Sequence, residues 1–193
     1  MLHVSIRTAA PEDAQALLAI YAPYVRETAI TFEVEVPTPE EFRRRMMHTL
    51  ARYPYLVAEG EDGILGYAYA GPFKERAAYD MCVETSVYVR QGLGRCGVGG
   101  KLMARLEQEL KRMGIRNLYA CIAVPEKEAD ETLDWNSQQF HTHLGFRLVG
   151  EFRRCGYKFG RFYDMVWMEK LIGQGEASTV SPIVPFGCLP SDT

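Results

Sequence analysis

Residues 87–100 read VYVRQGLGRCGVGG, and this stretch decides how the rest of the chain is interpreted. A strand-like run passes into a glycine-rich turn over residues 92–100, and an amphipathic helical pattern follows it. The pattern places apolar residues at every fourth position: Val98, Leu102, Leu106 and Leu110. Gly114 then ends it, as glycine commonly does at the end of a helix. The stretch therefore predicts a strand, a glycine turn and a helix in direct succession.

A helix that begins in a glycine turn is suited to bind an anion. Its first N–H groups have no partner within the helix, and the helix dipole adds partial positive charge at that end. Because glycines let a phosphate approach the backbone closely, the turn is a candidate pyrophosphate site. A glycine-rich turn that binds no ligand is the equally common alternative.

Two widespread phosphate-binding motifs fit this turn poorly. A Walker A loop needs glycine where Arg95 stands, and serine or threonine where Leu102 stands. The dinucleotide fingerprint fits formally as Gly92-x-Gly94-x-x-Gly97. However, no acidic residue closes the next predicted strand, residues 117–124, to bind a ribose hydroxyl.

The remaining elements follow from periodicity and turn signals. Helices are expected from about residue 14, from Thr38 to about residue 52, over 98–113 and over 137–144. Strands are expected at residues 4–7, 55–59, 64–70, 83–89, 117–124, 147–157 and 162–169. Strands 83–89 and 117–124 are joined through a helix and should be parallel. This order predicts one mixed-sheet α/β domain over residues 1–172, followed by a Gly/Ser/Pro-rich tail over 173–193, mobile or packed on a neighbour.

Composition narrows the function classes. The 193 residues are 47% apolar and 24% charged, the balance of an ordinary globular protein, and the net charge of −3 argues against nucleic-acid binding. No run approaches the ~18 apolar residues of a membrane span, and the first residues lack a secretory signal. The five scattered cysteines contain no C-x-x-C pair. We therefore expect a cytoplasmic protein with no membrane, nucleic-acid or metal partner.

The glycine turn also belongs to a larger pattern. Arg95-x-Gly97-x-Gly99 resembles the acyl-CoA loop of the GCN5-related N-acetyltransferases (GNAT), Gln/Arg-x-x-Gly-x-Gly/Ala, although Gly94 occupies the Gln/Arg position. The resemblance extends from residue 6 to about residue 170 and includes Leu144-Gly145-Phe146. Within this superfamily the chain is most similar to phosphinothricin N-acetyltransferases, through residues 53–59, 67–74, 84–89 and 156–160. The resemblance implies a mixed, mostly antiparallel twisted sheet flanked by helices, with splayed central strands.

Glu84 is the candidate general base. It lies on the strand that enters the glycine turn, among Val83, Val87 and Val89, where burial should raise its pKa. A structural pairing with Lys74 or Arg76 would perturb the carboxylate as well. The resemblance favours the first role, since the base of phosphinothricin acetyltransferases falls on this residue and acts by direct attack of the amine.

The resemblance also implies acetyl-CoA as co-substrate. Backbone groups of Val87, Tyr88 and Val89 would bind the pantetheine arm, besides ordinary sheet packing, and one amide could stabilise the oxyanion. The pyrophosphate would be held by Arg95, Cys96, Gly97, Val98, Gly99 and Gly100. Asp134 and Asn136 compete for the position of the asparagine that contacts CoA in the family.

His141 stands where many GNAT members carry a tyrosine that protonates the departing thiolate. An imidazole could donate that proton or hold the acceptor, and a purely structural histidine is the alternative. Ser137, four residues earlier, is expected as a helix cap or a substrate contact.

The acceptor pocket is expected from Phe32, Ser86 and the segment Lys74-x-Arg76-x-x-Tyr79. Two cations and a phenol suit a small anionic amino acid, although a solvated basic loop is the common alternative. The resemblance therefore implies acetylation of the primary amine of a phosphinothricin-like or methionine sulfoximine-like acceptor, in a homodimer whose residues 159–163 help to wall the neighbour's site. A peptide or protein amine as acceptor, or an acyl-CoA-binding module without turnover, are the alternatives.

Overall fold

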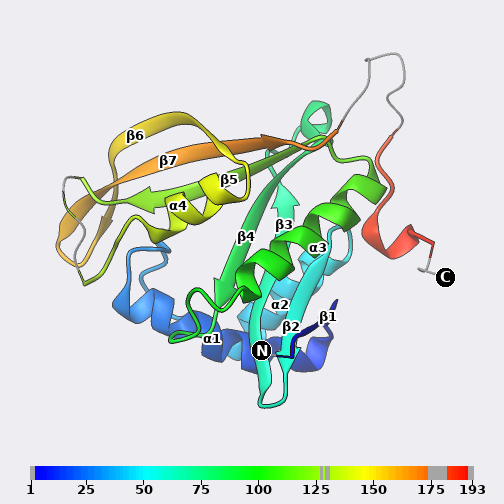
Figure 1. Cartoon of the computed structure of the whole chain (residues 1–193), viewed down its shortest axis with the longest axis horizontal. Coiled ribbons are helices and arrows are strands. Elements are labelled where there is room, and N and C mark those ends of the chain that lie inside the picture. Colours follow the sequence, from blue (N-terminus) through cyan, green and yellow to red (C-terminus); the bar gives the residue numbers. More distant parts are fainter. Residues whose placement is uncertain (1–2, 127, 129–130, 174–181, 191–193) are drawn as a thin grey trace.

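The structure is a computed structural model that describes residues 3–126, 128, 131–173 and 182–190 (Figure 1). Within these residues lie seven strands and four α-helices. The strands are β1 (Ser5–Thr8), β2 (Tyr55–Gly60), β3 (Gly63–Pro72), β4 (Cys82–Val89), β5 (Asn117–Val124), β6 (Arg147–Lys158) and β7 (Arg161–Leu171). The helices are α1 (Ala14–Glu27), α2 (Pro39–Leu50), α3 (Val98–Met113) and α4 (Asn136–His143).

All strands belong to one sheet in the order β1-β2-β3-β4-β5-β7-β6. Neighbouring strands are antiparallel except β4 and β5, which are parallel and joined through α3. The predicted mixed, mostly antiparallel α/β fold is therefore confirmed, including the parallel pair. Both predicted hairpins are present, with Gly63 and Gly160 at positive φ in their turns.

β4 and β5 pair only over a short length. Their register runs from Cys82 and Asn117 to Glu84 and Tyr119, after which each strand continues for five residues without its neighbour. β5 stays paired with β7 along its whole length, and β4 stays paired with β3. The sheet therefore opens into a wedge between β4 and β5, which is the predicted splay of the central strands.

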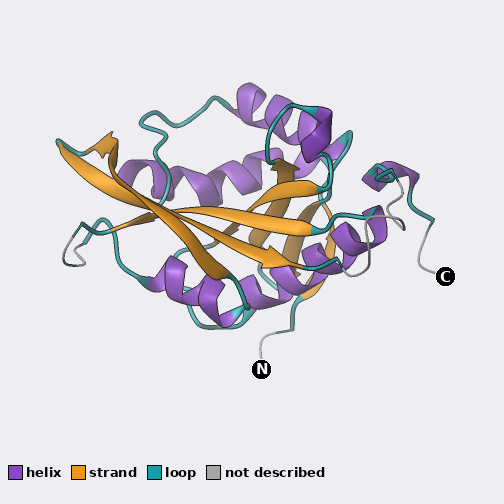
Figure 2. Cartoon of the chain, turned by 90° about the horizontal axis from the view of Figure 1, so that it is seen from above, coloured by secondary structure: helices purple, strands orange, loops and turns teal. Residues whose placement is uncertain are grey.

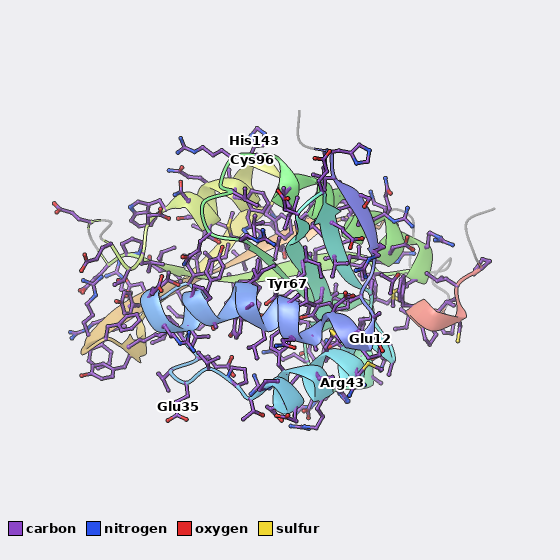
Figure 3. The ribbon with its side chains drawn as sticks, turned by 90° about the horizontal axis from the view of Figure 1, so that it is seen from below. Glu12, Glu35, Arg43, Tyr67, Cys96 and His143 are labelled. Carbon is purple, nitrogen blue, oxygen red and sulfur yellow. The ribbon has the colours of Figure 1, made fainter. Side chains whose placement is uncertain are left out.

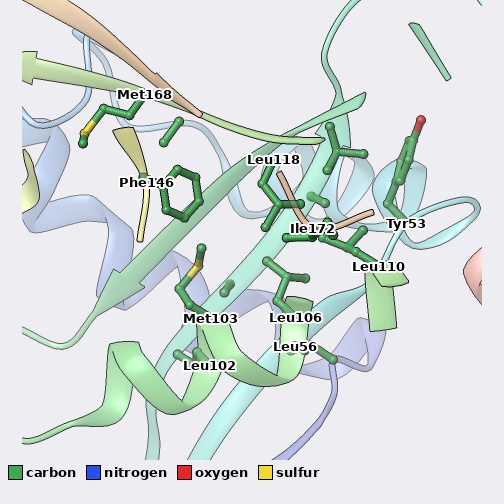
Figure 4. Close-up of a cluster of buried hydrophobic side chains, with 14 of the residues drawn as sticks. Tyr53, Leu56, Leu102, Met103, Leu106, Leu110, Leu118, Phe146, Met168 and Ile172 are labelled. Atoms are coloured by element: carbon green, nitrogen blue, oxygen red, sulfur yellow. The ribbon is translucent and has the colours of Figure 1, made fainter. Parts of the chain in front are cut away.

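Helices cover the two faces of the sheet (Figure 2). The apolar stripe of α3 packs with Leu56, Leu118, Phe146, Met168 and Ile172 in one buried cluster (Figure 4). On the opposite face, α1 and α2 bury Leu17, Phe42 and Met46 against Tyr55 and Tyr67. Figure 3 shows Tyr67 behind α1, whereas Glu12, Glu35 and Arg43 point outward. Each face therefore has its own core, and the wedge lies between them.

Helix boundaries follow the expected capping chemistry with one exception. Thr38 caps α2, because its hydroxyl accepts the amide of Glu41 at 3.2 Å. The expected cap of α4 is wrong: its N-cap is Trp135, and Ser137 lies within the first turn. Instead, the side chain of Asp134 accepts the amide of Asn136 at 2.9 Å just before the helix.

The segment after residue 172, which is expected as a tail, lies only partly within the described residues. Residues 174–181 and 191–193 lie outside the described residues. Residues 182–190 pack on this same chain, where the amide of Val184 donates to the carbonyl of Met113 at the end of α3. Ile183, Phe186 and Leu189 pack against the cluster under α3. In Figure 1 the described end of the chain lies beside the C-terminal end of α3. This part of the segment therefore covers the domain's own surface.

None of the helices in the described part of the chain combines the length and the apolar composition that crossing a membrane requires.

Candidate active site

A cleft occupies the wedge between β4 and β5. One wall is made by Thr85, Ser86, Val87 and Tyr88, and the other by Ala120, Cys121, Ile122 and Ala123. Ile30, from the loop between α1 and α2, and Ser137 and His141 of α4 complete the lining. The cleft is open to solvent, and the volume within it that water-sized molecules can occupy is ≈ 50 Å³. The structure thus brings together Ser86, Val87, Tyr88, Ser137 and His141 among the predicted site residues.

The backbone of β4 offers free hydrogen-bonding groups to this cleft. The amide of Arg90 donates to the carbonyl of Leu65, so the even-numbered residues of β4 direct their backbone toward β3. Because the backbone N–H and C=O groups of successive residues in a strand point to opposite sides, those of Val87 and Val89 point into the wedge. The hydroxyl of Tyr24 already donates to the carbonyl of Val89 at 2.6 Å. The N–H and C=O of Val87 and the N–H of Val89 remain for a ligand.

The glycine turn has the geometry of an anion site at the start of α3. Gly97 is the N-cap at φ 79°, and its carbonyl accepts the first intrahelical bond, from Lys101 at 3.1 Å. In this described turn, the amides of residues 97–100 donate no hydrogen bond. The amide of Cys96, in contrast, donates weakly to Leu93 at 3.4 Å. Four adjacent backbone donors therefore stay available at the positive end of the helix dipole.

The glycines of the turn have different roles. Gly97 needs its left-handed φ, whereas a Cβ at Gly99 would approach the ring of Phe140 in α4 to 3.2 Å. A Cβ at Gly94 or Gly100 would meet nothing within 4 Å. Arg95 adopts a positive φ of 64° as a non-glycine residue. Gly97 thus shapes the turn, and Gly99 lets α3 and α4 pack together beside the cleft.

Glu84 lies where the cleft begins, one residue before the first lining residue. It is half-buried, and burial raises the pKa of its carboxyl, while the nearby charge of Lys74 opposes the rise. Within the described chain it forms no ion pair with Lys74, Arg76 or any other cation. Glu84 is close enough to Cys121 on the far wall to raise the pKa of that thiol. The geometry therefore leaves the Glu84 carboxylate available for proton transfer.

His141 is buried, with 5% of its surface exposed, between the rings of Phe140 and Phe146. Its Nδ1 lies 2.8 Å from the carbonyl of Ser137, one turn earlier in α4. Since a carbonyl only accepts hydrogen bonds, Nδ1 carries the proton and Nε2 carries the lone pair in the neutral ring. Burial lowers the pKa of His141, which favours this neutral form. Besides packing between these rings, His141 lines the cleft.

The expected acceptor residues Lys74, Arg76 and Tyr79 lie on the loop between β3 and β4, next to the end of β4 that stays paired with β5. Lys74 is exposed and lies over the rings of Phe73 and Trp167, at 5.0 and 5.8 Å from their centroids. Tyr79 packs edge-on against Phe73. Arg76 is exposed on the same loop. The loop therefore carries Lys74 close to Glu84, whereas neither Lys74 nor Arg76 lines the cleft.

Phe32 does not line the cleft; its ring packs near Tyr163, and Ile30, two residues earlier, reaches the cleft instead. Asp134 and Asn136 bond to each other through their side chains and the Asn136 amide. Neither of these two lines the cleft.

The prediction from sequence missed the β5 wall, Cys121 above all. The signal was present, because a parallel strand beside a splayed strand must form the opposite wall of the opening. Ile30 carried no comparable signal, since it comes from a loop more than 50 residues away from β4.

No group of three or more metal-ligating side chains converges within the part of the chain that the structure describes.

Comparison with known proteins matches this geometry. A family profile described as "Acetyltransferase (GNAT) domain" matches residues 6–167, which is most of the chain. The chain belongs to the GNAT acetyltransferase family. A phosphinothricin N-acetyltransferase of Streptomyces coelicolor is 39% identical over 171 residues, covering 86% of this chain and 95% of that protein.

Two further relatives bear on the site of this GNAT chain. An L-methionine sulfoximine/L-methionine sulfone acetyltransferase of Pseudomonas aeruginosa is 33% identical and covers 87% of this chain and 94% of its own length. The crystal structure of a GNAT superfamily phosphinothricin acetyltransferase from Sinorhizobium meliloti, in complex with AcCoA, superposes with a TM-score of 0.82 at 29% identity. That superposition covers 95% of this chain and 98% of the other.

Proposed function

We propose that this acetyltransferase moves the acetyl group of acetyl-CoA to the primary amine of a small anionic amino acid analogue, such as phosphinothricin or methionine sulfoximine. The observation that carries the proposal is the wedge between β4 and β5: free backbone groups of β4 and His141 line it, and Glu84 directly precedes its first β4 residue. The relatives that act on such acceptors align along nearly the whole chain.

Acetyl-CoA fits the wedge in a defined direction. Its diphosphate binds the free amides of residues 97–100 at the positive end of α3. Its pantetheine amides then pair with the free backbone groups of Val87 and Val89, as a strand would. This direction brings the thioester toward Glu84, where the wedge closes.

Glu84 removes one proton from the acceptor ammonium, directly or through one water, and the neutral amine attacks the thioester carbonyl. The C–S bond then breaks, CoA leaves as its thiolate, and this thiolate takes up the second proton that the nitrogen loses. A backbone N–H of β4 stabilises the oxyanion that develops. Direct attack is also favoured by the state of Cys121, the cysteine in the cleft lining. Desolvation and the charge of Glu84 raise the pKa of its thiol to about 12, so it stays protonated and weakly nucleophilic.

His141 holds the acceptor in this scheme. Its neutral ring presents the Nε2 lone pair, which accepts a hydrogen bond from the amine. It can donate to the leaving thiolate only after it has taken up a proton. The lowered pKa of His141 disfavours the imidazolium form before the reaction, so we assign His141 to acceptor binding and not to proton donation.

The acceptor's anionic group binds the cations of the loop after β3. Lys74 is close enough to Glu84 to oppose the rise in the pKa of its carboxyl, and Arg76 is exposed two residues later. A cation this close to the base suits an amino acid, whose carboxylate lies next to the amine that Glu84 deprotonates. Asp134 and Asn136, at the start of α4, stay candidates for the second contact with CoA.

The active form is a homodimer that joins through the β6–β7 hairpin. β6 is the edge strand of the sheet, and Tyr157, Phe159 and Phe162 near its turn are 60%, 47% and 44% exposed. Exposed aromatic residues at a strand edge suit an isologous contact with a second copy. This contact would bring residues 159–163 of one copy to the acceptor side of the other.

The test is thiol release from acetyl-CoA with a panel of acceptors. Phosphinothricin and methionine sulfoximine should each support release, and neutral amines of the same size should support much less. Release with an N-terminal peptide amine alone would identify a peptide acetyltransferase. Binding of acetyl-CoA without release for any amine would identify a module without turnover, and either result would overturn the proposed acceptor class.

A further inference from the structure

A buried lysine joins the β6–β7 hairpin to the loop after α1. Lys158, the last residue of β6, is only 4% exposed. Its Nζ donates to the carbonyls of Thr28 and Thr31, both at 2.8 Å. These partners lie about 130 residues earlier in the chain, so the contact is purely tertiary. A charged side chain is rarely this buried unless its hydrogen bonds are specific.

The same loop is fastened by two neighbouring contacts. A Cβ at Gly156 would lie 2.3 Å from the Phe32 ring, so the missing side chain provides the space for Phe32. The amide of Ala29 donates to the carbonyl of Thr132 at 3.0 Å, and the hydroxyl of Thr132 bonds that of Tyr163. The hairpin and the segment before α4 therefore enclose residues 28–32 from two sides.

Lys158 holds the loop with hydrogen bonds and not with an ion pair. Burial lowers the pKa of its ammonium, and the charge of Glu33 only partly offsets this. Glu33 itself is engaged by Arg45 at 2.5 Å and by the hydroxyl of Tyr21 at 2.6 Å. Lys158 forms no ion pair with any carboxylate in the described residues. An ammonium serves here because it supplies several donors from one atom, enough for two carbonyls.

We propose that Lys158 is a positioning residue for the acceptor site, which fixes residues 28–32 so that Ile30 forms its part of the cleft lining. This rests on the proposed function, because it assigns Ile30 to the acceptor side of an acetyl transfer. The groups assigned to CoA come from β4 and from the start of α3, with Asp134 and Asn136 as further candidates. Among the residues that the structure describes, the contacts of the Lys158 ammonium are with Thr28, Thr31 and Phe159, and with none of these groups. Loss of the ammonium should therefore weaken acceptor binding and spare the binding of acetyl-CoA.

The test is Lys158→Met, which keeps most of the side-chain length and removes all three donors. Two buried carbonyls then lose their partner, and we expect the KM for the acceptor to rise about tenfold or more. The KM for acetyl-CoA should stay within about twofold of the wild-type value, because the contacts assigned to acetyl-CoA are unchanged. Lys170→Met is the matched control: this lysine of β7 pairs with Glu107 at 2.6 Å on the α3 face, so both KM values should stay as in the wild type.

Gly156→Ala is the second variant, because it displaces Phe32 without removing the charge. It should reproduce the rise in the acceptor KM, which separates loop position from the charge itself. Amide hydrogen exchange over residues 28–33 gives a readout without turnover: both variants should exchange faster there, and residues 97–102 should not change.

Unchanged exchange over residues 28–33 in Lys158→Met would overturn the proposal, as would an equal rise in both KM values. If the wild-type protein acetylates no acceptor, the proposed function fails, whereas faster exchange confined to this loop would still support the role of Lys158 in holding it.

Discussion

Glu84 and Tyr119 are the last residues at which β4 and β5 lie side by side. The hydroxyl of Thr85, the next residue, donates to the carbonyl of Tyr119 at 3.2 Å and fixes the junction. Beyond this pair the strands separate, and the cleft lies between them. The proposed base is therefore held where the sheet is still rigid, next to the place where a ligand must act as the missing strand.

Glu84→Gln should reduce kcat by about 10²- to 10⁴-fold, the usual contribution of a positioned general base. The dissociation constant of acetyl-CoA should stay the same, because the glycine turn and the β4 backbone are untouched. Thiol-release assays measure kcat, and calorimetric titration with acetyl-CoA measures the dissociation constant. Glu61→Gln, in the turn between β2 and β3, is the matched control and should leave both unchanged. An undiminished rate in Glu84→Gln would remove this residue from the mechanism.

The pH dependence of kcat/KM follows from the same carboxyl. Burial raises the pKa of Glu84 above its usual 4.5, and only the ionised form accepts a proton. Activity should therefore fall as the pH decreases through this raised pKa, at a higher pH than an exposed glutamate would give. The low-pH limb should disappear in Glu84→Gln. If the kcat/KM profile of that variant keeps a low-pH limb with the same midpoint, the limb reports the titration of another group.

His141 should make the protein less stable in acid. Burial lowers its pKa in the folded state below the unfolded value of 6.5, so the unfolded chain binds the proton more readily. This contribution to stability is complete above pH 6.5 and is lost as the pH falls through the interval between the two pKa values. In His141→Gln, the melting temperature measured by circular dichroism should fall less between pH 7 and the acid range than in the wild type. His143→Gln, exposed on the same helix, should keep the wild-type slope.

Gly97→Ala should destabilise the protein by about 1–2 kcal/mol, because its φ of 79° is costly for a residue with a Cβ. The strained turn should also bind acetyl-CoA more weakly. Gly94→Ala is the control, since its Cβ would meet nothing within 4 Å and its φ is not positive. Urea unfolding should place that variant within about 0.5 kcal/mol of the wild type. Equal effects of the two substitutions would contradict the assigned role of Gly97.

Phe159→Asp tests the dimer without straining the turn, because aspartate tolerates the positive φ of 50° found there. Removing one exposed aromatic contact from each copy should weaken association about 30-fold or more and reduce turnover in parallel. Light scattering during gel filtration measures the mass. Leu171→Asp, 64% exposed at the far end of β7, should leave the mass unchanged. A wild-type protein that is monomeric at assay concentration would refute the dimer.

Much of the fold could be predicted from local sequence. The four-residue spacing of Val98 to Leu110, the αL glycine at position 114 and the Asp62-Gly63 turn each depend on interactions within a few residues. The parallel pairing of β4 and β5 followed from the helix between them. In contrast, Ser137 was expected to cap α4, but an Asp134 bond to the backbone starts that helix instead.

The sequence by itself determined the elements, their order, the glycine turn and the candidate base, because those features depend on residue type and short spacing. Only the tertiary structure decided which strand ends separate, that Cys121 and Ile30 line the cleft, and that Nε2 of His141 is the free nitrogen. It also decided that Lys158 meets two carbonyls from the other end of the domain. These relationships join residues that are distant along the chain, and only packing of the sheet against its helices brings them within bonding distance.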